Sequence, residues 1–175
     1  MKNLLYVVSV ALFLTAGVFG QDKTQTGTPS KDSPTTPSET FTREKFDPAR
    51  DPKTDLKEAV EMATKSGKRI ILDIGGEWCG WCVYMDTFFS KNPPLSKIRD
   101  DNFIWVKVNM SEQNENKTFL KLYPEPSGYP HLYILSKTGR LLRSQDTSYL
   151  ELGKGYNIVK FTQFLRTWSP KKVHK

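Results

Sequence analysis

Residues 69–82 read Arg-Ile-Ile-Leu-Asp-Ile-Gly-Gly-Glu-Trp-Cys-Gly-Trp-Cys, and this stretch decides the fold. Its apolar part, 69–74, predicts a buried strand, and a helix is expected from Cys79 to about Ser90. A strand that leads into a helix places the first thiol at the helix start, where unpaired backbone N–H groups favour an anion. The anion would be a thiolate, the species that attacks disulfides and binds metals. Cys79 and Cys82 are the only cysteines of the chain, so any sulfur chemistry occurs at this pair.

The spacing of the two cysteines makes them a poor structural staple. In small secreted domains, stabilising disulfides usually link distant segments. A two-residue gap closes a very short loop and removes little entropy from the unfolded chain. The spacing therefore favours redox chemistry or metal binding.

The first twenty residues have the features of a secretory signal. Lys2 supplies a positive charge, residues 4–16 form an almost unbroken apolar stretch, and Val18 and Gly20 are small enough to precede a cleavage site. The stretch is shorter than the roughly 20 apolar residues that span a bilayer. We therefore expect residues 1–20 to be a cleaved signal peptide, with an uncleaved anchor as the alternative.

The segment that follows, residues 21–53, is rich in Thr, Ser, Pro and Lys and has hardly any large apolar side chain before Phe41. Such a segment buries too little surface to offset its ordering entropy, which predicts a disordered spacer. A structured arm is the alternative, indicated only by Phe41 and Phe46. The part from 54 to 170 has the length of one domain, and residues 171–175 form a basic tail.

The formal charge of +7 is carried mainly by the predicted domain. Residues 21–53 contain six basic and six acidic side chains, whereas 55–175 contain nineteen basic and thirteen acidic ones. A basic excess is compatible with an acidic partner, a membrane surface or nucleic acid. The basic residues are scattered and are not interleaved with aromatic ones, so we expect a solvated basic surface and no nucleic-acid partner.

The hydrophobic pattern predicts a mixed α/β domain. A helix is expected over 55–65, with Thr54 as its N-cap and Gly67 as its stop. The further expected strands are 103–109, 131–135 and 141–144, and the further expected helices are 95–100, 116–122 and 156–168. The first two strands are joined through a helix and should be parallel. The last two form a hairpin, so the sheet is mixed, and helices on both of its faces bury one core.

This element order, together with Trp78-Cys79-Gly80-Trp81-Cys82, resembles the thioredoxin fold. Thioredoxins carry a buried acid six residues before the first cysteine, here Asp73, and a lysine in the next strand, here Lys107. They also have a cis-proline before the third strand, here Pro130. The chain is similar to secreted bacterial thioredoxin-like proteins in which a methionine follows the motif, here Met85. Its departures from ordinary thioredoxins are Gly75 in place of an aromatic residue, Trp81 in place of proline, Tyr129 before the third-strand proline and His131 after it.

The resemblance implies a role for each motif residue. Cys79 would attack a substrate disulfide, and Cys82 would then resolve the mixed disulfide. Burial should raise the pKa of Asp73, which would exchange a proton with Cys82, and Lys107 would tune this acid. Substrate contacts would come from an aromatic rim and a backbone segment beside the sulfurs, formed by Trp78, Trp81, Tyr129 and Pro130.

Two functions of other classes stay open. Cys79, Cys82 and His131 could supply three ligands to copper or zinc in a metal carrier. However, Cys-x-x-Cys is only half of a usual zinc site, and the chain has no second cysteine pair. The other alternative is a binding module that uses the same fold without redox activity. Neither cysteine has been lost, which argues against it.

We therefore expect a thiol–disulfide oxidoreductase, exported to the bacterial periplasm, that works as a monomer without a cofactor or metal. Its partners would be protein thiol or disulfide substrates and a redox protein that recycles the cysteine pair. The pattern leaves the direction of electron flow open. The missing proline between the cysteines favours a potential less reducing than the about −270 mV of thioredoxin.

Overall fold

The computed structural model describes residues 44–171. The predicted signal peptide, most of the predicted spacer and nearly all of the predicted basic tail lie outside these residues. Within the described part, no helix combines the length and apolarity needed to cross a membrane.

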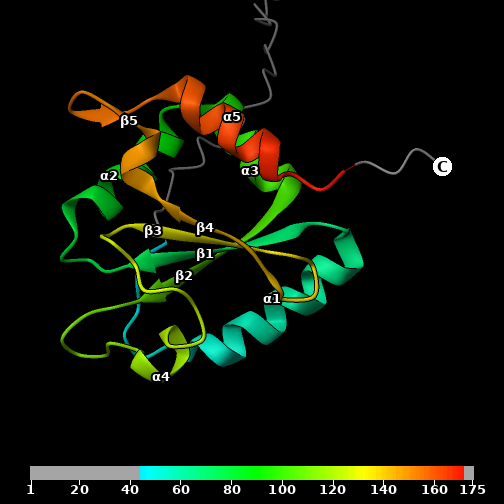
Figure 1. Ribbon diagram of the computed structural model, residues 1–175, viewed down its shortest axis with the longest axis vertical. Coiled ribbons are helices and arrows are strands. Elements are labelled where there is room, and N and C mark those ends of the chain that lie inside the picture. Colours follow the sequence, from blue (N-terminus) through cyan, green and yellow to red (C-terminus); the bar gives the residue numbers. More distant parts are fainter. Residues whose placement is uncertain (1–43, 172–175) are drawn as a thin grey trace, which may run out of the picture. The chain divides into compact units, whose positions relative to one another are not determined.

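A four-stranded mixed sheet forms the centre of the domain (Figure 1). The strand order is β2-β1-β3-β4. β1 (Arg69–Gly75) pairs in parallel with β2 (Phe103–Asn109) and antiparallel with β3 (His131–Leu135), which pairs antiparallel with β4 (Leu141–Asp146). The predicted strands and the predicted directions are confirmed. β1 is buried along nearly its whole length, which explains its continuous apolar run.

Helices cover both faces of the sheet (Figure 1). α1 (Pro52–Ser66) and the short α4 (Lys117–Leu120) pack on one face, against alternate β1 residues such as Ile70 and Leu72. α2 (Gly80–Ser90), α3 (Pro93–Asn102) and α5 (Ile158–Trp168) pack on the other, where Ile71 contributes to the core. Successive side chains of a strand point to opposite faces, so β1 supplies both cores.

The start of α1 and the region before α5 differ from the sequence predictions. The N-cap of α1 is Asp51, whose carboxylate accepts from the backbone N–H groups of Lys53 and Thr54, so the prediction of Thr54 as the cap was wrong. Pro52 occupies the first turn, where its missing N–H costs nothing. Gly67 ends the helix as predicted, in the left-handed conformation with φ of 74°. The chain also forms a turn and a small hairpin that the pattern did not reveal, η1 (Thr147–Leu150) with β5 (Glu151–Leu152) and β6 (Gly155–Tyr156).

The structured part begins before the expected boundary at residue 54. Phe46 is only 3% exposed and packs against the two cysteines. The side-chain amide of Asn114 donates to the carbonyl of Pro48, which fastens the same segment to the loop after β2. Residues 44–51 are therefore an arm of the folded domain, and we call them the N-terminal arm.

Candidate active site

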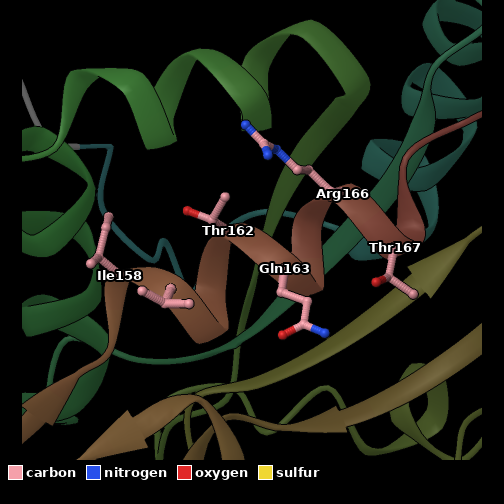
Figure 2. A pocket seen from close by; sticks show the side chains of 6 residues that line it. Ile158, Thr162, Gln163, Arg166 and Thr167 are labelled. Carbon is pink, nitrogen blue, oxygen red and sulfur yellow. The ribbon is translucent and has the colours of Figure 1, made fainter.

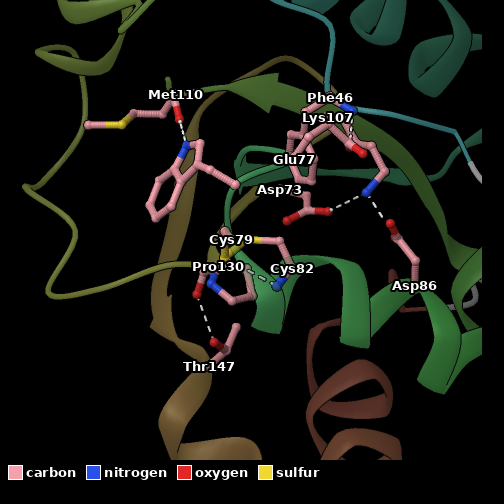
Figure 3. Close-up of a disulfide and its surroundings, with 11 residues drawn as sticks. Phe46, Asp73, Glu77, Cys79, Cys82, Asp86, Lys107, Met110, Pro130 and Thr147 are labelled. Atoms are coloured by element: carbon pink, nitrogen blue, oxygen red, sulfur yellow. Dashed lines mark hydrogen bonds and ion pairs between the residues drawn. A yellow bond between two sulfur atoms is a disulfide. The ribbon is translucent and has the colours of Figure 1, made fainter. Parts of the chain in front are cut away.

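The two cysteines lie at the junction between β1 and α2, joined by a disulfide (Figure 3). Cys79 is the N-cap of α2, and its Sγ accepts from the backbone N–H of Cys82 at 3.2 Å. Cys79 is 5% exposed and Cys82 is fully buried. Because helix N-termini favour negative charge, this position stabilises a thiolate on Cys79 when the disulfide is reduced.

A buried ionic group lies behind the disulfide (Figure 3). The ammonium of Lys107 contacts Asp73 Oδ2 at 3.2 Å and Asp86 Oδ1 at 2.8 Å. Asp73 and Lys107 stand opposite each other in the β1–β2 register, and Asp86 comes from α2. The indole N–H of Trp105 also donates to Asp73 Oδ2. Asp73 Oδ1 has no hydrogen-bond partner among residues 44–171, so one oxygen of this buried acid is available for proton transfer.

The electrostatics of this group oppose ionisation of Asp73. Desolvation in its fully buried site raises the pKa of Asp73, and the nearby charge of Lys107 offsets this only in part. Burial alone would lower the pKa of Lys107, but the charges of Asp73 and Asp86 outweigh it and raise that pKa. Lys107 therefore stays an ammonium ion, while Asp73 is an acid that takes up a proton more readily than an exposed aspartate.

The predicted aromatic rim forms two separate contacts around the disulfide. Trp78, which is 59% exposed, meets the ring of Tyr129 edge to face, with centroids 5.7 Å apart. The indole N–H of Trp78 donates to the carbonyl of Met110, which fixes the ring over the loop after β2. Trp81 packs on Tyr156 instead. The rim therefore consists of two separate aromatic pairs, Trp78 with Tyr129 and Trp81 with Tyr156.

Two glycines make this arrangement possible. A Cβ at Gly75 would lie 2.5 Å from Cys82 Sγ, so the end of β1 must lack a side chain where the buried sulfur rests on it. A Cβ at Gly76 would lie 2.4 Å from the indole nitrogen of Trp78. The departure from an aromatic residue at position 75 thus has a steric reason in this chain.

Pro130 is buried directly before β3, and the Tyr129–Pro130 peptide bond is cis, as predicted. The hydroxyl of Thr147 in η1 donates to the Pro130 carbonyl at 2.7 Å. Tyr129 packs against the cluster formed by Phe46 and the cysteines. The Tyr129–Pro130 segment therefore lies beside the disulfide.

His131 does not join the cysteines. Its Nε2 shares a 2.7 Å hydrogen bond with Ser144 on β4, and its ring contacts Tyr133. His131 and Tyr133 point to the α1 face of the sheet, whereas Asp73 points to the α2 face. Burial lowers the pKa of His131. Residues 44–171 hold no group of three or more His, Cys, Asp or Glu side chains that could bind a metal, so the three predicted ligands do not form a site.

Three residues that contact the site were not predicted as site residues from the sequence. Asp86 gave a usable signal, since it lies seven residues after Cys79 on a helix whose inner face is otherwise apolar. Phe46 indicated only a structured arm and not its place at the cysteines, and Thr147 gave no signal, because their contacts join segments more than fifteen positions apart in the chain.

Of two surface grooves, one includes a residue of the cysteine motif and the other lies on α5. A groove of about 470 Å³ opens beside Trp78 and is lined by Trp78, Met110, Ser111, Glu112, Gln113 and Glu115. A second groove, of about 370 Å³, runs along the outer side of α5 (Figure 2) and is lined by Ile158, Val159, Thr162, Gln163, Arg166 and Thr167. The α5 groove contains no sulfur and no buried charge, so we assign the chemistry to the disulfide and its surroundings.

Residues 51–137 match a family model described as thioredoxin-like. This part of the chain has a thioredoxin-like fold. The match includes the disulfide, the buried ionic group up to Lys107, and Pro130. The N-terminal arm before residue 51 lies outside it.

Solved structures show the same thioredoxin-like fold. A disulphide isomerase from Xylella fastidiosa Temecula1 superposes with a TM-score of 0.61 at 19% identity, over 70% of this chain and 94% of that one. The reduced C-terminal domain of DsbD from Neisseria meningitidis has a TM-score of 0.50 at 21% identity, over 66% of this chain and 95% of that one. At these identities the likeness concerns the fold.

Two curated relatives share part of the thioredoxin-like sequence. An uncharacterized protein of Caenorhabditis elegans is 32% identical over 73 residues, which is 41% of this chain and 10% of the relative. Spermatogenesis-associated protein 20 of Mus musculus is 30% identical over 77 residues, 42% of this chain and 10% of that protein. The chain thus spans about a tenth of the length of these relatives.

Proposed function

We propose that this chain is a thiol–disulfide oxidoreductase that exchanges disulfides with exported protein substrates through Cys79 and Cys82. The observation that carries the proposal is the disulfide at the start of α2 with a buried, partly unpartnered carboxyl group behind it. A disulfide that only stabilised the fold would need neither the helix-start position nor Asp73. The apolar signal-like residues 1–20 favour export, and we propose the bacterial periplasm as the compartment.

In the reducing direction, the thiolate of Cys79 attacks one sulfur of a substrate disulfide. A bond forms between Cys79 Sγ and that sulfur, the substrate S–S bond breaks, and the other substrate sulfur leaves as a thiolate that takes a proton. Cys79 is suited to the attack because it is the more exposed cysteine and accepts a hydrogen bond from the helix start.

Cys82 then resolves the mixed disulfide. It loses its proton to Asp73, and its thiolate attacks Cys79 Sγ. The Cys79–Cys82 disulfide forms, and the second substrate sulfur leaves as a thiolate and is protonated. Two electrons have passed from the dithiol to the substrate, and the oxidising direction is the same sequence in reverse. A separate redox partner restores the starting state of the cysteine pair.

The surroundings of the disulfide support a protein substrate. Trp78, Trp81 and Tyr129 offer apolar contacts in the motif and beside it, and a groove opens next to Trp78. We propose that an extended segment of the substrate lies along the Tyr129–Pro130 segment. The enzyme acts as a monomer in this scheme, since one domain supplies every group.

The first experiment traps substrates in the source cells. Replacing Cys82 with Ala leaves Cys79 able to attack but removes the resolving sulfur, so mixed disulfides that dissolve on reduction should accumulate. Cys79→Ala is the matched control and should trap far fewer partners, because the remaining sulfur is buried. If Cys82→Ala accumulates none while Cys79 still reacts with a thiol reagent, the exchange mechanism is wrong.

The second experiment tests the proton acceptor. Asp73→Asn keeps the shape of the side chain but cannot take the proton of Cys82, so resolution should slow by about 10²–10⁴, the usual contribution of a positioned acid or base. Formation of the mixed disulfide should change much less. Stopped-flow measurement of both steps decides the matter, and equal slowing of both would contradict the role of Asp73.

A further inference from the structure

The N-terminal arm places an aromatic ring on the redox site. Phe46 is 3% exposed and forms one apolar cluster with Cys79, Cys82 and Tyr129. Its backbone N–H donates to the carboxylate of Glu77 at 2.9 Å, which fixes the arm to the loop before the cysteines. The ring is therefore held in place from a segment that lies outside the matched thioredoxin-like residues.

The same ring covers the buried ionic group. The ammonium of Lys107 lies 4.1 Å from the centroid of the Phe46 ring, within the range of a cation–π contact (Figure 3). A Cβ at Gly75 would lie 3.1 Å from Phe46 Cζ. The ring thus fills space at the end of β1 that Gly75 leaves open, directly over Lys107.

We propose that Phe46 is a positioning residue of the redox site, whose ring keeps water away from the Lys107–Asp73 pair and so sets the protonation of Asp73. The inference rests on the proposed function, because the protonation of Asp73 matters to exchange through the proton that it takes from Cys82. Phe46 of the N-terminal arm would then act on exchange through Asp73.

Burial controls the protonation of Asp73. Desolvation is the largest cause of its raised pKa, and Lys107, itself only 8% exposed, is the main opposing charge. Removing the ring would let water reach this pair, which relieves the desolvation and lowers the pKa of Asp73. The loss of the cation–π contact acts on Lys107 and is the smaller effect. The titratable groups that face this pair are Asp86 on α2 and Tyr156 on β6, and Glu77 in the cysteine loop accepts from the backbone N–H of Phe46.

The test measures the titration of Asp73 directly, by the carboxyl ¹³C chemical shift in the oxidised full-length protein. Phe46→Ala should move the midpoint to lower pH, and Phe46→Leu, which retains apolar cover but no ring face, should move it less. Phe119→Ala is the matched control. Phe119 is equally buried, at 3% exposure, but it packs on the opposite face of the sheet, so its loss should leave the midpoint unchanged.

Each result of this titration counts for or against the proposal. An unchanged midpoint in Phe46→Ala overturns it, and if that variant does not fold, an unchanged midpoint in Phe46→Leu does so. An equal shift in Phe119→Ala would show that general loosening, rather than loss of the ring, moves the titration, and that result also overturns it.

A kinetic arm separates this inference from the proposed function. The wild-type protein is mixed with a disulfide-containing peptide; absence of any exchange refutes the proposed function, while the Asp73 titration still tests the ring. If exchange occurs, Phe46→Ala should slow resolution by about 3- to 10-fold, a small part of what a positioned acid or base contributes. Its pH profile should shift in the same direction as the titration, and an unshifted profile would contradict the role of Phe46 in exchange.

Discussion

Lys107→Met removes the cation that lies between two buried carboxyl groups while keeping an apolar side chain of similar length. The ammonium contacts Asp73 Oδ2 at 3.2 Å and Asp86 Oδ1 at 2.8 Å, and the Lys107 side chain is only 6% exposed. Removing one partner of such a buried group leaves uncompensated charge and costs about 3–5 kcal/mol. A domain of this kind has a total stability of about 5–15 kcal/mol, so the loss is large.

The loss of unfolding free energy in Lys107→Met should increase as pH rises. Lys107 holds down the pKa of Asp73, which burial already raises, so the variant has a still higher folded pKa. A carboxyl group with a raised folded pKa contributes stability that is fully present below its unfolded pKa and is lost as pH rises through the folded pKa. The deficit of Lys107→Met relative to the wild type should therefore be largest above neutral pH and shrink as pH falls.

Urea unfolding of the oxidised protein at about pH 8 and about pH 5 measures both effects. With a slope of about 2 kcal/mol per molar urea, the midpoint should fall by roughly 1.5–2.5 M at the higher pH. Lys97→Met is the control, because its ion pair with Asp101 on α3 is exposed and such pairs contribute at most about 1 kcal/mol. Adding Asp73→Asn to Lys107→Met should recover part of the loss. A midpoint shift below about 0.5 M, or an equal deficit at both pH values, would refute this account of the buried group.

The other predictions concern single contacts of the site. Because burial raises the pKa of Asp73, the unfolding free energy of the wild type should fall as pH rises through that titration, and calorimetry of Asp73→Asn over the same range should show no such fall. Gly75→Ala forces a Cβ to within 2.5 Å of Cys82 Sγ, so urea unfolding should show a loss of about 1–3 kcal/mol; an unchanged midpoint would contradict the close approach. Thr147→Val leaves the Pro130 carbonyl without its donor and should cost about 1–3 kcal/mol by thermal unfolding, whereas Thr147→Ser should cost less.

The strands were predictable because a strand that is buried on both faces is rich in apolar residues, which a short stretch of sequence reveals. The strands 69–75, 103–109 and 131–135 are rich in apolar residues, and their predicted limits of 69–74, 103–109 and 131–135 agree with the structure to within one residue. Parallel pairing of the first two followed from the helix between them, and the hairpin of the last two from the short turn. These inferences need no knowledge of distant contacts.

Features that depend on distant or very short contacts could not be predicted. The hairpin of β5 and β6 has two residues in each strand, too few for a period to show. The N-cap of α1 is different, because its signal is local: Asp51 directly precedes Pro52, which favours the first turn of a helix, and the choice of Thr54 overlooked it. The position of His131 was ambiguous, because only the pairing register decides which face of the sheet it occupies.

Gly75 and Phe46 show why the cysteine motif could be recognised from the sequence while the residues that pack around it could not. The motif residues around Cys79 and Cys82 lie close together in sequence, whereas the ring that covers Lys107 comes from more than thirty residues before Cys79. A glycine at the end of β1 leaves room for the buried sulfur but also leaves the ionic group without cover from its own strand. The N-terminal arm supplies the ring that contacts Lys107 and the cysteines, so residues 44–51 belong to the folded domain and are not the end of a spacer.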